Sequence, residues 1–194
     1  MYDLVTIGKN AKAASRELRT LKTSIRNDAL NSIAAALRSN IPAILEANRL
    51  DVANAKTNGI KAAMLDRLTL NESRIEAIAV AVEQLVSLPD PIGIVDSGCE
   101  RPNGLQILKT RAPIGVIAMI YEARPNVTVD AASLCLKSGN ACILRGGKEA
   151  FASNRTLINI MRDAIEKAGV PKDAIAMIED TSRDTASRLM KLDG

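Results

Sequence analysis

The 194-residue sequence contains no histidine, and this absence excludes several common kinds of site. Neither a Ser-His-Asp triad nor a Cys-His pair can form, and no metal ion can be held by imidazole. We therefore expect any general base to be a carboxylate, lysine, tyrosine or cysteine side chain, and we expect no metal cofactor.

Aromatic residues are almost absent, since the chain has two tyrosines, one phenylalanine and no tryptophan. So few rings cannot form a stacking platform for unpaired bases. The pI of about 9.1 suggests nucleic acid as a partner, but cations and anions nearly balance outside residues 101–148. We therefore expect no nucleic acid partner.

Long hydrophobic runs are also missing. The longest nearly apolar segment, 112–121, has about ten residues, whereas a membrane-spanning helix needs roughly 18. Residues 1–30 carry scattered charges and lack the apolar segment of a signal peptide. We therefore expect no membrane partner.

Cysteine is scarce, and the three cysteines form no CxxC pair. This usage is typical of reduced thiols in the cytoplasm and not of a disulfide framework. Cys135 and Cys142 lie in apolar stretches, so we expect both in the core. Cys99 has charged neighbours, and we expect it to be exposed and inert.

Positive charge is concentrated in one stretch. Residues 101–148 carry seven cations and two anions, a net charge of +5, whereas the whole chain has +4. Two interpretations remain open: a solvated basic face, or a binding site for an anionic ligand.

The first 90 residues predict helices. Apolar residues recur at three- to five-residue steps over 11–37, and Pro42 suits the first turn of another helix. Over 71–88 the apolar residues share one helical face, with Asn71 or Ser73 as the cap. We expect a helical arm over 1–91 and a connector over 92–110, which is rich in glycine and proline.

The pattern changes after residue 110. Short apolar strands at 114–120, 141–144 and 175–178 alternate with helices at 125–137, 150–168 and 181–192. This order predicts an α/β fold with a parallel βαβαβα sheet over 111–194. No strand follows the last helix, so we expect one sheet edge to lack its cover.

Ligands of open α/β sheets bind beyond the carboxyl ends of the strands, which here are three loops. The loop 145–149 places a Gly-Gly pair between Arg145 and Lys148, where backbone N–H groups and two cations could hold an anion. It matches neither common phosphate-binding fingerprint. A plain turn is the alternative.

The other two loops are less distinctive. In the loop 121–126, Arg124 could clamp a carboxylate or phosphate, or it could simply pair with Glu122 at the surface. In the loop 179–183, Thr181 or Ser182 could cap the last helix, or a phosphate could bind there.

A long run of residues resembles a known family. The run 111–149, RAPIGVIAMIYEARPNVTVDAASLCLKSGNACILRGGKE, closely resembles the gamma-glutamyl phosphate reductases, also called glutamate-5-semialdehyde dehydrogenases. LDRL at 65–68, LPDPIG at 88–93, RPNG at 101–104 and the closing RLMKLDG agree with it. The resemblance implies the aldehyde dehydrogenase superfamily and its Rossmann-like domain. It also implies reduction of L-glutamyl 5-phosphate to L-glutamate 5-semialdehyde by NADPH in proline biosynthesis.

The resemblance also implies site residues. The superfamily's Lys-Pro-Ser-Glu, which contacts the adenosine ribose, matches the segment Arg145, Gly146, Gly147 and Lys148. Lysine in place of glutamate favours NADP(H), because it replaces an anion beside the 2′-phosphate with a cation. Thr181 and Ser182 would complete the cofactor site. The superfamily's Trp-Asn-Phe-Pro matches residues 122–125, with Ala123 at the asparagine position, and Glu122, Arg124 and Asn126 would bind the substrate.

The resemblance covers only the N-terminal part of the family. Family members carry the nucleophilic cysteine in a later domain, so we expect no catalytic residue in this chain and no activity of the chain alone. The superfamily usually forms dimers or larger assemblies, so we expect a homo-oligomer at full length. The alternative is a short non-catalytic NADP(H)-binding protein, or half of a split enzyme.

Overall fold

The computed structural model describes residues 3–192, and Asp193 and Gly194 of the RLMKLDG motif lie outside this part. The first half of the chain is helical. Its helices are α1 (Leu4–Leu18), α2 (Thr23–Ser39), α3 (Ile41–Thr57), α4 (Ala62–Leu68) and α5 (Glu72–Ser87). Within residues 3–192, no helix combines the length and the apolar character needed to cross a bilayer.

Local sequence signals set several helix ends. Pro42 lies in the first turn of α3, as predicted. Of the two candidate caps of α5, Asn71 is the one used, because its side chain accepts a hydrogen bond from the Arg74 N–H at 2.8 Å. The helical stretch predicted over 11–37 is interrupted at residues 19–22. There the Arg26 guanidinium donates to the Leu21 carbonyl at 2.6 Å and stabilises the turn.

The second half contains the predicted parallel sheet. Its strands are β3 (Val116–Ile120), β4 (Ala141–Arg145) and β5 (Ile175–Met177), in the order β3-β4-β5. The following helices are α6 (Pro125–Lys137), α7 (Phe151–Lys167) and α8 (Arg183–Met190), with short 3-10 turns η1 (Lys148–Ala150) and η2 (Lys172–Ala174). Val116 lies opposite Ala141, and Ile120 lies opposite Arg145. The predicted α/β fold is confirmed.

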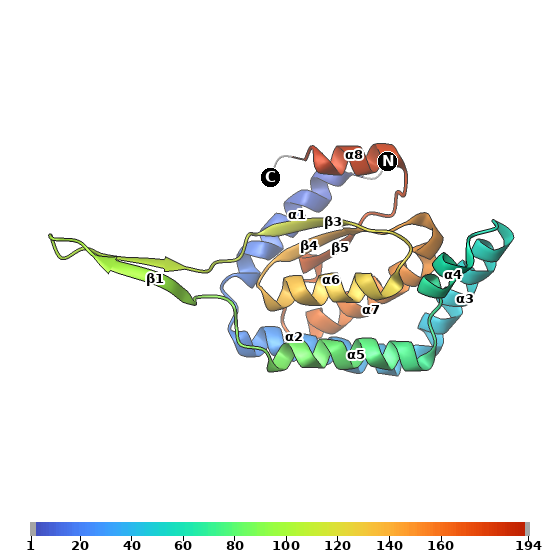
Figure 1. Cartoon of the computed structure of the whole chain (residues 1–194), viewed down its shortest axis with the longest axis horizontal. Coiled ribbons are helices and arrows are strands. Elements are labelled where there is room, and N and C mark those ends of the chain that lie inside the picture. The colour runs from blue at the N-terminus through green and yellow to red at the C-terminus, as the bar shows by residue number, and fades with distance from the viewer. Residues whose placement is uncertain (1–2, 193–194) are drawn as a thin grey trace.

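The helices cover the sheet in layers (Figure 1). α6 and α7 lie on one face of the sheet, whereas α1 and α8 lie on the other. α2 and α5 form a further layer outside α6 and α7. Buried apolar residues of the helices, β4 and β5 form the main core, and a smaller cluster lies apart from it, made of Ala55, Leu68, Ala123 and Ala150.

The segment expected to be a connector contains an antiparallel hairpin. β1 (Val95–Glu100) pairs with β2 (Gln106–Thr110), and every residue of both strands is exposed. The hairpin projects well beyond the helices (Figure 1). At its base, Arg111 forms an ion pair with Asp96 at 2.8 Å.

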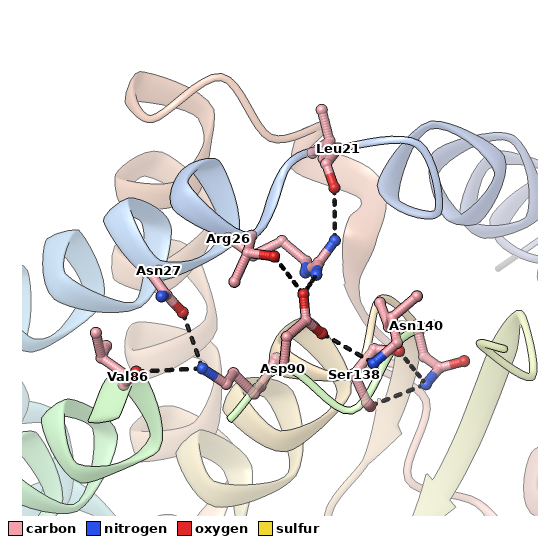
Figure 2. Close-up of polar contacts among 10 residues, drawn as sticks. Leu21, Arg26, Asn27, Val86, Asp90, Ser138 and Asn140 are labelled. Atoms are coloured by element: carbon pink, nitrogen blue, oxygen red, sulfur yellow. Dashed lines mark hydrogen bonds and ion pairs between the residues drawn. The ribbon is translucent and has the colours of Figure 1, made fainter. Parts of the chain in front are cut away.

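A partly buried polar cluster holds the chain leading into the hairpin (Figure 2). The Arg26 guanidinium of α2 and the Thr23 hydroxyl donate to the Asp90 carboxylate, which also accepts the Ile92 N–H at 2.9 Å. Lys137, at the end of α6, donates to the Asn27 side chain at 3.0 Å. The cluster therefore ties together α2, α6 and the segment between α5 and β1.

Candidate functional site

The three candidate loops lie at the same edge of the sheet, because the strands that precede them are parallel. The loop 121–126 follows β3, the loop 145–149 follows β4, and the loop 179–183 follows β5. The Tyr121 N–H donates to the Arg145 carbonyl at 3.1 Å, and the Ile178 N–H donates to the Leu144 carbonyl at 2.9 Å. These hydrogen bonds extend the parallel strand pairing one residue beyond the ends of β3 and β5.

Arg145 joins two of the loops. Its guanidinium donates to the Thr181 carbonyl oxygen and to the Ser182 carbonyl oxygen, the latter at 3.2 Å. Its Nε is buried and has no hydrogen-bond partner within the described residues. The structure thus brings Arg145, Thr181 and Ser182 together, with the arginine engaged in holding the loops.

Ser182 caps α8. Its hydroxyl oxygen accepts the Thr185 N–H at 3.2 Å, which is the simpler of the two interpretations of this loop. The Asp180 carboxylate accepts the Thr185 hydroxyl and the Ser182 N–H, the latter at 2.8 Å. These hydrogen bonds, with that from Thr185 the strongest, lower the pKa of Asp180.

The glycine pair permits close packing between loops. A Cβ at Gly146 would lie 2.2 Å from the Asn154 side-chain nitrogen, and a Cβ at Gly147 would lie 3.3 Å from the Ala123 nitrogen. A side chain at Gly146 would displace the Asn154 side chain of α7, and one at Gly147 would press on the backbone of the loop 121–126. The glycines therefore serve the packing of the loop 145–149 against α7 and against the loop 121–126, whether or not a ligand binds beside them.

Lys148 is the free cation of the loop 145–149. It is exposed, and no residue between 3 and 192 forms a hydrogen bond or ion pair with its ammonium group. It borders a cavity of about 480 Å³ together with Asn54, Asn58 and Glu149. This lysine can bind an incoming anion without breaking an existing pair.

The N-terminus of α7 is already occupied by a carboxylate. Asp51 of α3 accepts hydrogen bonds from the Ala152 N–H at 3.1 Å, the Ser153 N–H at 2.7 Å and the Ser153 hydroxyl at 2.6 Å. A phosphate at this helix end would compete with Asp51. Sequence reasoning missed this residue, because its partners lie about a hundred residues later in the chain.

A buried chain of hydrogen bonds supports the end of β3. The Tyr121 hydroxyl lies 2.7 Å from the Thr128 hydroxyl, which donates to the Asn154 side-chain oxygen at 2.8 Å. Burial raises the pKa of Tyr121 to about 12, against the opposing effect of the Thr128 hydrogen bond. The Asn154 nitrogen is buried with no partner in the described part of the chain.

The candidate substrate residues lie at the start of α6. The alternative interpretation of this loop was a surface ion pair between Arg124 and Glu122. Their side chains do not form this pair, and both are exposed. The Asn126 side-chain nitrogen donates to Asp130 at 3.2 Å. Ala123 is buried, so its side chain supplies no polar group here.

The cysteines and the basic stretch 101–148 are the remaining sequence features. Cys135 and Cys142 are buried and Cys99 is exposed on the hairpin, as predicted. The basic stretch 101–148 does not form one face. Its cations are divided among the hairpin, the two ends of α6 and the loop 145–149.

Comparison with known proteins places the chain in a family. The aldehyde dehydrogenase family model matches residues 3–194. Gamma-glutamyl phosphate reductase of Carboxydothermus hydrogenoformans is 50% identical over 194 residues, which are 100% of this chain and 47% of the relative. The chain thus spans about half the length of the curated relatives it matches.

Solved structures agree. The crystal structure of gamma-glutamyl phosphate reductase from Thermotoga maritima superposes with a TM-score of 0.95 at 39% identity, covering 97% of this chain and 46% of that one. The enzyme of the same name from Saccharomyces cerevisiae gives a TM-score of 0.89 at 36% identity, covering 95% and 48%. By sequence and by fold, this chain belongs to the aldehyde dehydrogenase family.

Proposed function

We propose that this chain is the N-terminal, cofactor-binding portion of an NADPH-dependent gamma-glutamyl phosphate reductase of proline biosynthesis. The observation that carries the proposal is the 50% identity to a reductase of that name over the whole chain. The relatives' activity would require the part of their sequence that this chain does not match. We propose that this part supplies the nucleophilic cysteine.

At the sheet edge, one residue is proposed to contact a nicotinamide cofactor directly, and another holds the loops in place. The Lys148 ammonium group has no partner within residues 3–192 and lies beyond the end of β4, where it would hold the 2′-phosphate of NADPH. Arg145 would act indirectly, because its guanidinium holds Thr181 and Ser182 against the end of β4. NADPH, when bound, supplies the hydride.

The substrate side of the site is proposed at the start of α6. Arg124 and Glu122 are exposed there, and neither is paired with the other. Arg124 would bind an oxyanion of L-glutamyl 5-phosphate. The Asn126 amide, already oriented by Asp130, would add a hydrogen bond.

The test of the cofactor site uses the chain fused to the remaining C-terminal portion of the Carboxydothermus relative. We expect the fusion to catalyse the phosphate-dependent oxidation of glutamate 5-semialdehyde by NADP⁺. Lys148→Glu should lower kcat/KM for NADP⁺ about tenfold or more and change that for NAD⁺ much less, since charge-assisted hydrogen bonds contribute about 1.5–3 kcal/mol.

The matched control is Lys167→Glu, which makes the same charge change at an exposed position at the end of α7. It should leave both cofactors unaffected. Equal losses with NADP⁺ and NAD⁺ in Lys148→Glu would contradict the role of Lys148. A fusion that folds and binds NADPH but never turns over would instead favour a non-catalytic binding protein.

A further inference from the structure

A second cavity lies beside the loop 121–126, and its lining includes no residue of the loops 145–149 and 179–183. It is open to solvent, has a volume of about 290 Å³ and is bordered by α4, the start of α5 and the start of α6. Leu70 and Ile78 contribute apolar, buried walls. Its polar rim includes three arginines from three different elements: Arg67, Arg74 and Arg124. This size suits a small ligand or one end of a larger one.

Of these three arginines, Arg74 is fixed by the protein. Its guanidinium pairs with the Asp66 carboxylate at 2.7 Å, and it also donates to the carbonyl oxygens of Asp66 at 2.5 Å and Thr69 at 2.7 Å. Within residues 3–192, Asp66 is the sole carboxylate that lines the cavity, and Arg74 neutralises it. No anion of the lining is left for the other two arginines.

Arg67 and Arg124 are unpaired. Both side chains are exposed, and within residues 3–192 neither forms a hydrogen bond or an ion pair through its guanidinium. An anion between two like charges that border one cavity offsets their mutual repulsion. Guanidinium groups bind carboxylate and phosphate oxygens through paired N–H donors. The cavity therefore has the charge and the donors of an oxyanion site.

The position of the cavity connects it with the sheet edge. Arg124 is the N-cap of α6 and follows directly on the loop after β3. Among the described residues no side chain caps this helix end, so the positive end of the helix dipole adds to the charge of the two arginines. Arg67 comes from α4, in the LDRL segment, which lies outside the three candidate loops.

We propose that Arg67 and Arg124 form a clamp for an oxyanion of the substrate, with Arg74 and Asp66 holding the wall against which it binds. The inference rests on the proposed function, since it takes the ligand to be an acyl phosphate of an acidic amino acid. Its phosphate and its carboxylate share the chemistry that the clamp recognises, and the experiment distinguishes them.

The experiment measures binding to the full 194-residue chain by isothermal titration calorimetry. The probes are inorganic phosphate, L-glutamate and a phosphonate analogue of glutamyl 5-phosphate that cannot be hydrolysed. We expect the phosphonate to bind, and Arg67→Gln and Arg124→Gln each to weaken it about tenfold or more. Arg67→Lys, which keeps the charge and loses the paired donors, should lie between. Competition by phosphate assigns the clamp to the phosphate group, and competition by glutamate assigns it to the carboxylate.

The matched control is Arg49→Gln, an exposed arginine of α3 that pairs with Glu46 and lies outside the cavity lining. It should bind the phosphonate like the wild type. Thermal unfolding of each variant shows that it is folded. Equal affinities for wild type and Arg67→Gln would overturn the clamp, as would failure of the wild-type chain to bind the phosphonate at millimolar concentration.

NADPH binding to the same samples separates the two proposals. NADPH binding that depends on Lys148, with no phosphonate binding that depends on Arg67, leaves the proposed function standing without the clamp. Phosphonate binding that depends on Arg67, without NADPH binding, supports the clamp and contradicts the cofactor role of the chain.

Discussion

Tyr121 places a hydroxyl group at the junction of β3, α6 and α7. The hydroxyl lies 2.7 Å from Thr128, whose own hydroxyl donates to Asn154. Burial raises the pKa of Tyr121 to about 12, because a phenolate here would lose its hydration. The neutral tyrosine is therefore the form that the folded chain stabilises.

This raised pKa predicts a loss of stability in alkali. Below pH 10, the ordinary pKa of tyrosine, the contribution is fully present, and it is lost as the pH rises from about 10 through the folded-state pKa of about 12. Tyr121→Phe should lower the free energy of unfolding by about 1 kcal/mol near neutral pH, through loss of one hydrogen bond.

Urea unfolding of both proteins at about pH 8 and about pH 11 checks this expectation. The stability gap between wild type and Tyr121→Phe should shrink at the higher pH, because the variant has no hydroxyl to titrate. The comparison also removes the effect of the lysines, which both proteins share. A gap that is constant over this range would show that Tyr121 ionises alike in both states.

Residue roles were predictable where the partner is close in sequence. The cap at Asn71 and the cap at Ser182 follow from residues three positions apart. The burial of Cys135 and Cys142 follows from their apolar neighbours. The engagement of Arg145 with Thr181 depends on two loops meeting in space, which no local pattern in the chain encodes.

At the scale of elements, α3 and α7 are joined by a cap that comes from a distant helix. The Asp51 carboxylate accepts two backbone N–H groups and one hydroxyl at the start of α7. Asp51 is 5% exposed, so water cannot replace these hydrogen bonds. The negative charge also faces the positive end of the helix dipole.

Removing this charge should destabilise the chain. Asp51→Asn replaces one of the two acceptor oxygens with an N–H₂ group, so one donor of α7 is left unsatisfied, and we expect a loss of about 1–3 kcal/mol. Denaturant unfolding measures it. Glu72→Gln, an exposed carboxylate in the first turn of α5, is the matched control and should change stability by less than about 0.5 kcal/mol. Equal effects of the two substitutions would contradict the buried cap.

The elements themselves were predictable where burial imposes a period. The face of α5 and the buried strand β4 could be read from apolar spacing. The hairpin could not be predicted in this way. Both faces of β1 and β2 are exposed, so burial does not impose an alternation of apolar and polar residues on them. Its one local signal is Asn103-Gly104, a typical turn pair, and Gly104 has a φ of +81° there.

For the whole molecule, the central question is whether the helical arm and the sheet fold as one unit. The boundary predicted at residue 91 separates a purely helical sequence pattern from the part that contains the strands. Yet a single core includes Leu30 and Ile33 of α2, Leu144 of β4, and Leu157 and Met161 of α7. α2 and α5 cover the outer sides of α6 and α7, so each half buries apolar surface of the other.

This shared core predicts a single unfolding transition. Burial of apolar side chains contributes about 25 cal/mol per Å² of surface removed from water, so a fragment of residues 92–194 would lose the burial that the outer helices give α6 and α7. We expect circular dichroism and NMR to show one coincident thermal transition for the full chain and no cooperative transition for the fragment.

Replacing residues 96–109 with a short Gly-Ser linker should preserve cooperativity, because the hairpin strands are exposed throughout. A fragment that unfolds cooperatively would instead show that the arm and the sheet are separate folding domains.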